Sequence, residues 1–332
     1  MRPLSNSPLG SVLGLVLLAS SSLGTAGCNK AVSHSHQPGS DEVRQFAGEY
    51  PIRVVCTIGQ VTEMLKRLGG NHLEVAGMMG PGIDPHLYRI VPADIKKLSE
   101  ADAIFYNGLH LEGRMTDTFV QMARRKPTFA VTEGLVDRVD KRLREPPEFA
   151  GMYDPHVWHD VALWSECVQD MAQALSKFDP KHTADYQKNA ETYLAELTEL
   201  HTFCQQEIAK IPADRRVLIT AHDAFGYFGQ AYGIEVFGLK GVSSEEEKDL
   251  AHQEEIQKML IERQIPAIFV ESAIAHRTVE ALVEPCRAAG WDVKIGGELY
   301  ADALGPAGSD ASNYTGMIRE NVRTIVGALG AE

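Results

Sequence analysis

The sequence lacks the marks of several protein classes. Its five cysteines form no Cys-x-x-Cys pair, which argues against a disulfide scaffold and against a thiolate zinc finger. Positive charge is scarce, with 32 Lys and Arg against 45 Asp and Glu, so nucleic-acid binding is not expected. The composition, 44% hydrophobic and 23% charged, argues against disorder and against a coiled coil. The 332 residues are enough for about two domains.

The N-terminus carries a short apolar run, Leu9–Leu18, which is too short to span a bilayer. The run follows Arg2 and leads into small residues that end at Cys28, a pattern that resembles a bacterial lipoprotein signal. We therefore predict a signal peptide over 1–27, lipidation of Cys28 and a polar, lipid-anchored tether over 28–48. Ordinary secretion with an unmodified Cys28 is the alternative. The protein is expected to be exported, and with the lipid it would be a periplasmic or cell-surface protein anchored to a bacterial membrane.

Two sets of short β-branched segments alternate with helical patterns along the rest of the chain. Such β-α-β alternation indicates parallel sheets with helices on their faces. We expect an α/β fold of two lobes, each with a mostly parallel four-stranded sheet. The predicted strands are Ile52–Ile58, His72–Met78, Ala101–Asn107, Thr128–Val131, Arg216–Thr220, Ile234–Gly238, Ala267–Val270 and Asp292–Ile295.

A long helical pattern separates the two sets of strands. It starts at Asp179-Pro180, with Asp as the N-cap and Pro at the first helical position, and no Gly or Pro interrupts it as far as Ile211. A helix of this length would extend for about 45 Å. We interpret 179–211 as a rigid linking helix between an N-terminal lobe, 49–178, and a C-terminal lobe, 212–332. The alternative is a long surface helix of a single domain.

Histidines and carboxylates follow several of the predicted strands. The tripeptide Asp-Pro-His occurs twice, ending at His86 and at His156, and in each copy the proline restricts the backbone next to the imidazole. His222 comes directly after a strand, and the segment 296–302 after the last strand ends in Asp302. Ligands of open α/β sheets bind at the carboxyl ends of strands. Three neutral imidazoles and one carboxylate would form a credible zinc or manganese site.

Neighbouring polar residues offer further roles. Asp84, Asp154 and Asp223 either orient the imidazoles as hydrogen-bond acceptors or form turns and helix caps. Glu298 competes with Asp302 as the carboxylate ligand. His159, three residues after His156, is either an accessory ligand or hydrogen-bond donor at the site, or a packed or surface histidine.

At these residues the chain resembles the TroA-like solute-binding receptors of bacterial zinc and manganese ABC importers, a superfamily that includes the ZnuA and PsaA proteins. The resemblance covers nearly the whole mature chain. It is carried by IDPHLY (83–88), YNGLHLE (106–112), DPHVWHDVALW (154–164), RRVLITAHDAFGYF (215–228), IPAIFVESAI (265–274) and GGELYADALG (296–305).

The resemblance implies one divalent metal bound between two lobes by His86, His156, His222 and Asp302, and it favours Asp302 over Glu298. Relatives with Glu in place of His222 look selective for manganese, and relatives built for zinc often carry a long His-rich loop. Residues 133–150 contain no histidine. The cargo is therefore expected to be Zn²⁺ or Mn²⁺, with Fe²⁺ as a third candidate.

We expect a binding protein and not an enzyme, because four protein ligands leave no open coordination position and no nucleophile motif is present. The expected partner is the ABC permease of the same import system, with no nucleic acid and with membrane contact through the N-terminal lipid alone. A monomer is expected. The alternatives are a zinc-dependent hydrolase with Glu298 or Asp223 as the base, and a lipoprotein adhesin.

Overall fold

The computed structural model describes residues 44–149 and 151–330, which belong to one compact unit. The predicted signal peptide, Cys28 and most of the predicted tether lie outside the described residues. Within the described ranges, no helix is both long enough and apolar enough to cross a membrane. The cysteines in these ranges are buried free thiols; they are Cys56, Cys167, Cys204 and Cys286.

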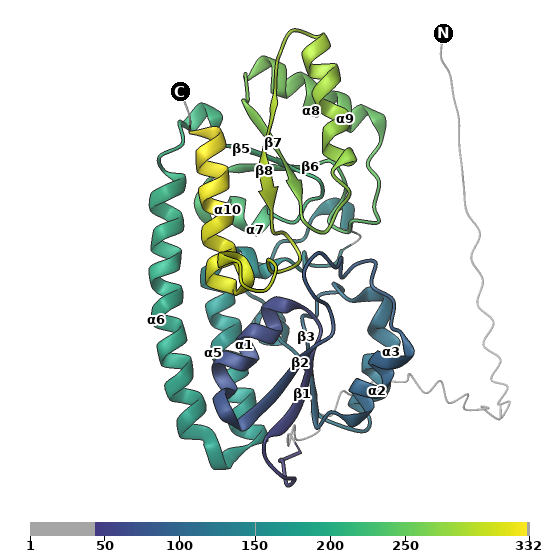
Figure 1. Ribbon diagram of the computed structural model, residues 1–332, viewed down its shortest axis with the longest axis vertical. Coiled ribbons are helices and arrows are strands. Elements are labelled where there is room, and N and C mark those ends of the chain that lie inside the picture. The colour runs from purple at the N-terminus through teal and green to yellow at the C-terminus, as the bar shows by residue number, and fades with distance from the viewer. Residues whose placement is uncertain (1–43, 150, 331–332) are drawn as a thin grey trace, which may run out of the picture. The chain divides into compact units, whose positions relative to one another are not determined.

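The first half of the unit is built on a four-stranded parallel sheet in the order β2-β1-β3-β4 (Figure 1). Its strands are β1 (Ile52–Cys56), β2 (Leu73–Gly77), β3 (Ala103–Tyr106) and β4 (Thr128–Ala130). Helices lie on both faces of the sheet, so the central strands are largely buried, as expected for a parallel sheet. These helices are α1 (Gly59–Gly69), α2 (Pro92–Glu100) and α3 (Thr116–Ala123), while the short α4 (Glu133–Asp137) packs against α5 (Val161–Phe178). The predicted first sheet is confirmed.

The second half contains β5 (Val217–Thr220), β6 (Glu235–Gly238), β7 (Ala267–Glu271) and β8 (Lys294–Leu299). All pairings are parallel, as predicted, but the strands form two pairs, β5-β6 and β7-β8, instead of one four-stranded sheet. Strands β5 and β7 are neighbours, yet the Glu271 side chain, and not a backbone carbonyl, accepts the amide of His222 at their ends. The flanking helices are α7 (Gly226–Tyr232), α8 (Leu250–Glu262), α9 (Arg277–Ala288) and α10 (Tyr314–Leu329).

Strand β8 continues past the predicted end at Ile295. The pairing with β7 shifts by one residue there, because Ile268 lies opposite Ile295 and Phe269 lies opposite Gly297, which leaves Gly296 as a bulge. A Cβ at Gly296 would come within 2.8 Å of Ala328 in α10, so the helix packs directly onto the bulge. A glycine pair that indicates a loop in the sequence is therefore part of the strand.

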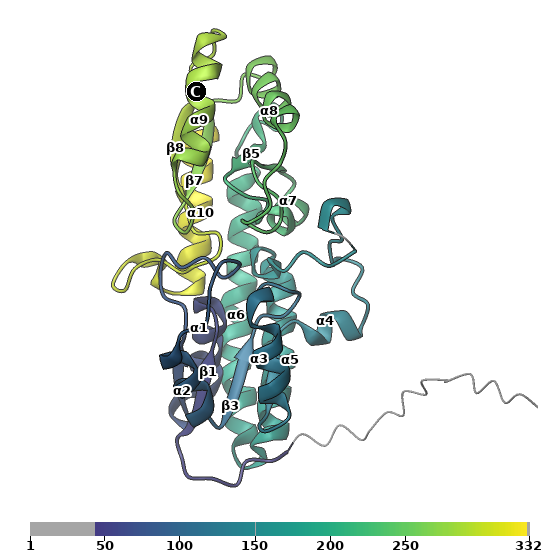
Figure 2. The same ribbon diagram turned by 90° about the vertical axis from the view of Figure 1, so that its right-hand side faces the viewer.

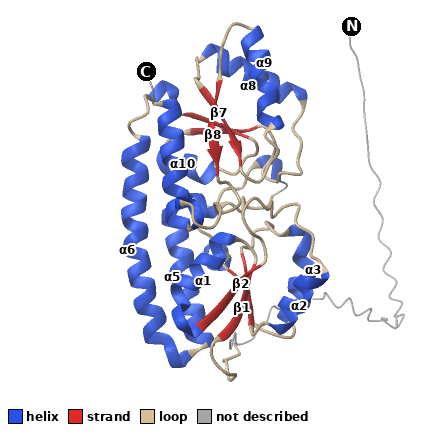
Figure 3. Ribbon diagram, in the orientation of Figure 1, coloured by secondary structure: helices blue, strands red, loops and turns tan. Residues whose placement is uncertain are grey.

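The long helix is α6 (Thr183–Ile208), 26 residues that follow a 3₁₀ turn at Pro180–His182. The prediction of a long helix is confirmed, but the first turn is 3₁₀ and Asp179 does not cap it with its side chain. Helix α6 lies beside α5 (Val161–Phe178) (Figure 2). It packs against α1 in the first half of the unit, and against α7 and α10 in the second half. It therefore contacts both halves of the unit. Figure 3 shows that loops gather between the two sets of strands.

The Asp179 carboxylate joins three elements at the start of α6. It accepts hydrogen bonds from Tyr50, His182 and Tyr186 at 2.8, 2.7 and 2.6 Å, and it is 1% exposed. We predict that Asp179→Ala lowers the free energy of unfolding by about 2 kcal/mol, because it leaves these donors without their acceptor. Urea unfolding of the metal-free protein measures this loss. Asp185→Ala, which removes an exposed hydrogen bond between His72 and the first turn of α6, should cost less than about 1 kcal/mol. Equal losses in the two variants would contradict the prediction.

Candidate metal centre

Four side chains converge between the two sets of strands. They are His86, His156, His222 and Asp302, and one ligand atom from each lies within 4.8 Å of all the others. None of these residues is more than 5% exposed. Within the described ranges this is the one group of His, Cys, Asp and Glu side chains with metal-binding geometry. The structure thus brings together the four residues that the sequence singled out.

The spacing of the donor atoms can be compared with that of a metal site. The Nε2 atoms of His86 and His156 are 3.2 Å apart, and the Asp302 oxygens lie 3.3, 3.4 and 3.8 Å from the Nε2 atoms of His222, His156 and His86. In a tetrahedral site with bonds of about 2.0 Å, neighbouring ligand atoms are about 3.3 Å apart. The arrangement therefore suits a single transition-metal ion bound by all four side chains.

The repeated Asp-Pro-His motif has a repeated local geometry. Asp84 accepts the backbone N–H of His86 at 2.9 Å, and Asp154 accepts that of His156 at 3.0 Å. In each case the aspartate closes a turn over the intervening proline, which holds the backbone of the histidine in place. His156 is followed by a buried 3₁₀ turn, Val157–His159, that leads into α5.

Carboxylates also fix the ring orientation of two histidines. The Nδ1 of His156 is 2.8 Å from Asp154 Oδ1, and the Nδ1 of His222 is 2.6 Å from Glu271 Oε2. Glu271 accepts the backbone N–H of His222 as well, at 2.9 Å. An imidazole that donates from Nδ1 presents the lone pair of Nε2, the form that ligates metals. Both rings therefore present Nε2 to the centre of the group.

The centre of the group contains polar atoms without hydrogen bonds. The Nε2 of His222 and both oxygens of Asp302 have no hydrogen-bond partner in the part of the chain that the structure describes. Buried polar atoms without partners are costly and uncommon in folded proteins. A cation held between them would supply the missing interactions.

The charges within the group strongly perturb its acid–base behaviour. Burial lowers the pKa of His86 to about 3, so this imidazole is neutral. Burial also opposes a charge on His156, but its hydrogen bond to Asp154 and the nearby Asp302 raise its pKa to about 9. The pKa of His222 is likewise raised well above its usual value, because Glu271 and Asp302 outweigh burial. Although burial favours the neutral acid, the charges of His222 and His156 hold the pKa of Asp302 well below its usual value.

Two residues proposed from the sequence lie outside the group. His159 donates from Nε2 to the carbonyl of Ala301 at 3.1 Å, and its ring packs on Phe225. It is buried among these residues and is not placed as a ligand. Glu298 lies in β8, is exposed and pairs with His276 at 3.1 Å, so the structure does not bring it to the group.

The aspartates next to the histidines differ from one another. Asp154 binds both the backbone and the ring of His156, as described above. Asp84 binds the backbone of His86, and its second oxygen accepts the hydroxyl of Ser244. Asp223 is buried and makes no hydrogen bond to the imidazoles of the group among the described contacts; one of its oxygens has no partner there.

Sequence reasoning missed two residues that contact the site. Glu271 ends β7 and is 1% exposed, and the sign that could have revealed it is a single acidic residue at the end of an apolar strand. Arg144 forms an ion pair with Asp154 at 2.8 Å. It lies in a segment rich in charged residues of both signs, where the sequence offers no sign of its role.

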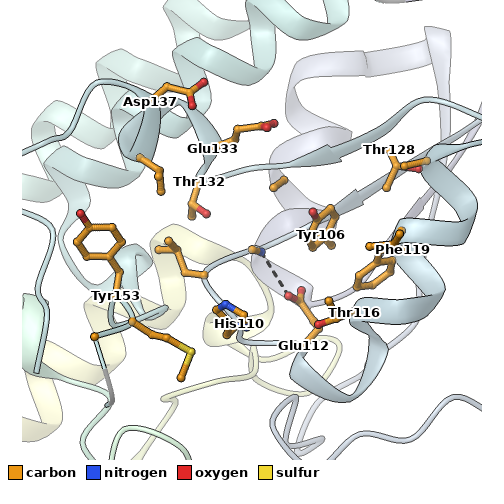
Figure 4. Close-up of a pocket in the computed structure, with 18 residues that line it drawn as sticks. Tyr106, His110, Glu112, Thr116, Phe119, Thr128, Thr132, Glu133, Asp137 and Tyr153 are labelled. Carbon is orange, nitrogen blue, oxygen red and sulfur yellow. Dashed lines mark hydrogen bonds between the residues drawn. The ribbon is translucent and has the colours of Figure 1, made fainter. Parts of the chain in front are cut away.

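A separate hollow of about 560 Å³ lies beside α3, α4 and the ends of β3 and β4. Figure 4 shows Tyr106, Phe119 and Tyr153 on its walls and the hydrogen bond from the Gly108 amide to Glu112. None of the four converging residues lines this hollow. The four-residue group, which is at most 5% exposed, is therefore separate from this hollow.

The chain is similar over most of its length to known metal-binding proteins. The chain is 40% identical over 291 residues to the manganese-binding lipoprotein MntA of Bacillus subtilis, which covers 88% of this chain and 94% of that protein. It is 43% identical over 277 residues to the zinc-binding protein TroA of Treponema pallidum, covering 83% of this chain and 88% of that protein. It is 28% identical over 284 residues to the manganese ABC transporter substrate-binding lipoprotein PsaA of Streptococcus pneumoniae serotype 4, covering 84% and 89%.

The solved structure of the periplasmic zinc-binding protein TroA superposes on this chain with a TM-score of 0.80 and 41% identity. The match covers 84% of this chain and 99% of that one, which confirms the α/β class with parallel sheets and a long helix. Residues 54–328 match the family described as zinc-uptake complex component A, periplasmic. This is a family of transport binding proteins, so the hydrolase alternative is set aside. The chain belongs to the periplasmic zinc-uptake complex component A family.

Proposed function

We propose that this chain is the extracytoplasmic receptor of a metal importer, which captures Zn²⁺ or Mn²⁺ on His86, His156, His222 and Asp302. The observation that carries the proposal is the enclosed group of donor atoms, in which His222 and Asp302 have no hydrogen-bond partner for the atoms that face the centre. Three neutral imidazoles and one carboxylate leave a divalent ion with a formal charge of about +1, which suits a site that must also release its ion.

The metal would join two lobes. We assign 49–178 to the N-terminal lobe, 179–211 to the linking helix and 212–332 to the C-terminal lobe. The first lobe then supplies His86 and His156, and the second supplies His222 and Asp302. A bound ion holds the two sets of strand ends together, so an ABC permease can distinguish the loaded receptor from the empty one by its shape. Substrate-binding proteins of this class have an ABC permease as their partner. We propose that this receptor acts as a monomer and delivers its metal to the permease of the same import system.

The N-terminal segment fits this role. Relatives named as lipoproteins support lipidation of Cys28 after removal of 1–27. The tether 28–48 would then hold the receptor close to its permease at the membrane. Mass spectrometry of the mature N-terminus tests this part of the proposal, since Cys28→Ala should remove both the lipid mass and the membrane association.

Affinity alone does not identify the metal, because zinc binds most nitrogen and oxygen sites more tightly than manganese does. The relatives include proteins named for zinc and for manganese. Elemental analysis of protein purified without added metal, followed by competition between Zn²⁺ and Mn²⁺, identifies the cargo directly.

Substitution of the ligands tests the site itself. We predict that Asp302→Ala and His222→Ala each reduce the affinity for Zn²⁺ and Mn²⁺ at least about 100-fold, because each removes one of four ligands. The measurement is a competition titration with a chromophoric chelator. His276→Ala is the matched control, since His276 is an exposed histidine paired with Glu298. Unchanged affinity in the first two variants, or loss in the control, would sink the assignment.

The pH dependence of binding follows from the raised pKa values of His156 and His222. Metal binds the neutral imidazoles, so below a pH of about 9 protons compete with the metal for His156. The raised pKa of His222 means that protons compete with the metal there as well. We predict that binding releases up to two protons and that affinity falls by up to about 100-fold for each pH unit below neutrality. Calorimetric titrations in buffers of different ionisation enthalpy count these protons. An affinity that stays constant between pH 8 and pH 6 would exclude the mechanism.

Glu271 provides a further test. In Glu271→Gln one side-chain oxygen must serve two donors of His222, and the new amide N–H groups oppose them. We predict a loss of affinity of about 10- to 100-fold. Glu298→Gln, an equivalent change in the neighbouring strand β8, should leave affinity unchanged. Equal effects of the two changes would remove Glu271 from the site.

A further inference from the structure

An arginine outside the four candidate ligands reaches the site from the segment between α4 and α5. The Nη1 of Arg144 donates to Asp154 Oδ2 at 2.8 Å, while the other oxygen of Asp154 accepts both N–H groups of His156. Asp154 is fully buried and the Arg144 side chain is 26% exposed. The arginine thus lies at the outer end of a chain of contacts that leads through Asp154 to the candidate ligand.

The backbone of Arg144 is held at the same place. Its carbonyl accepts the amide of Asp154 at 2.9 Å, and its amide donates to the hydroxyl of Tyr227 at 3.1 Å. The Tyr227 hydroxyl in turn donates to the carbonyl of Asp154 at 2.9 Å, and the guanidinium lies 5.8 Å from the centre of the Tyr227 ring. Helix α7 from the second half of the chain therefore fixes both the arginine and the aspartate.

Helix α7 also provides the space for the guanidinium. A Cβ added at Gly226 would overlap the Nη1 of Arg144. Glycine at the first position of α7 leaves a notch that the guanidinium fills beside Asp154. An alanine there would displace the Arg144 guanidinium without changing any charge.

The charge on Arg144 matters because the site is rich in buried carboxylates. Asp154, Glu271 and Asp302 all approach the imidazoles of the group. Among the described ion pairs of these three carboxylates, one is with a Lys or Arg side chain, and that side chain is Arg144. Without it, Asp154 Oδ2 would lose its ion-pair partner, and the hydrogen bonds to His156 would have to hold the carboxylate in place unaided.

We infer that Arg144 is a positioning residue of the metal site: it sets the orientation of His156 through Asp154 and thereby the affinity and geometry of metal binding. The inference rests on the proposed function. It also gives the segment 138–149, which has no histidine, a role at the site through Arg144.

The test combines Arg144→Gln, which removes the charge, with Gly226→Ala, which displaces the guanidinium and keeps the charge. We expect each to weaken Co²⁺ and Mn²⁺ binding about 10- to 100-fold, as for other residues that orient metal ligands. The visible absorption of bound Co²⁺ also depends on its coordination geometry: it is strong in a tetrahedral site and weaker when a ligand is lost to water. The melting temperature of each metal-free variant is measured as well, because displacement of the guanidinium also leaves the buried Asp154 without its ion pair.

Arg142→Gln is the matched control for Arg144→Gln, because Arg142 carries the same charge on the same segment but pairs with Asp140 and Glu166. Gly327→Ala, in open space on α10, is the control for Gly226→Ala. Affinity and Co²⁺ absorption within about twofold of the wild type in both test variants would overturn the inference and leave the proposed function intact. Failure of the wild-type protein to bind Co²⁺, Mn²⁺ or Zn²⁺ would instead overturn the proposed function.

Discussion

The buried carboxylate of Asp302 is the constraint on which the site depends. Both of its oxygens lie away from water without a hydrogen bond, and an ionised carboxylate in such a place must have positive charge beside it. Three imidazoles surround it. Asp154 and Asp302 raise the pKa of His156, and Glu271 and Asp302 raise that of His222. Protons on His156 and His222, or one divalent ion, can each supply the two positive charges. Metal capture would therefore release these protons, as the pH prediction states.

The protein orients each histidine by a different contact. His156 is held by the aspartate of its own motif, His222 by Glu271 from a neighbouring strand, and His86 by a turn that fixes its backbone alone. The carboxylates that orient the rings add negative charge to a buried region, which raises the cost of leaving the centre without a cation. The same carboxylates, Asp154 and Glu271, thus orient the histidine ligands and attract the cation.

The sequence was informative where function depends on local pattern. The doubled Asp-Pro-His, the histidine directly after β5 and the segment that ends in Asp302 could all be found, and so could the parallel first sheet and the long helix. The choice of Asp302 over Glu298 came from resemblance, because the sequence does not show that Glu298 still lies in β8 while Asp302 lies in the loop beyond its end. Glu271 and Arg144 act across 49 and 10 residues of chain through contacts that form only in the folded state. The one local sign of Glu271 was an acidic residue at the end of an apolar strand, and no local pattern indicated Arg144.

Enclosure of the site has a consequence for release. With none of the four residues more than 5% exposed, an ion held among them cannot leave unless the strand ends separate. Helix α6 packs against elements of both halves, so a large rotation between them would break its contacts. A large rotation is not needed. Bonds of about 2.0 Å to the metal are lost when one pair of ligands moves by about an ångström, because coordination weakens steeply with distance. A small displacement of His222 and Asp302 away from His86 and His156 would therefore break the coordination and begin release.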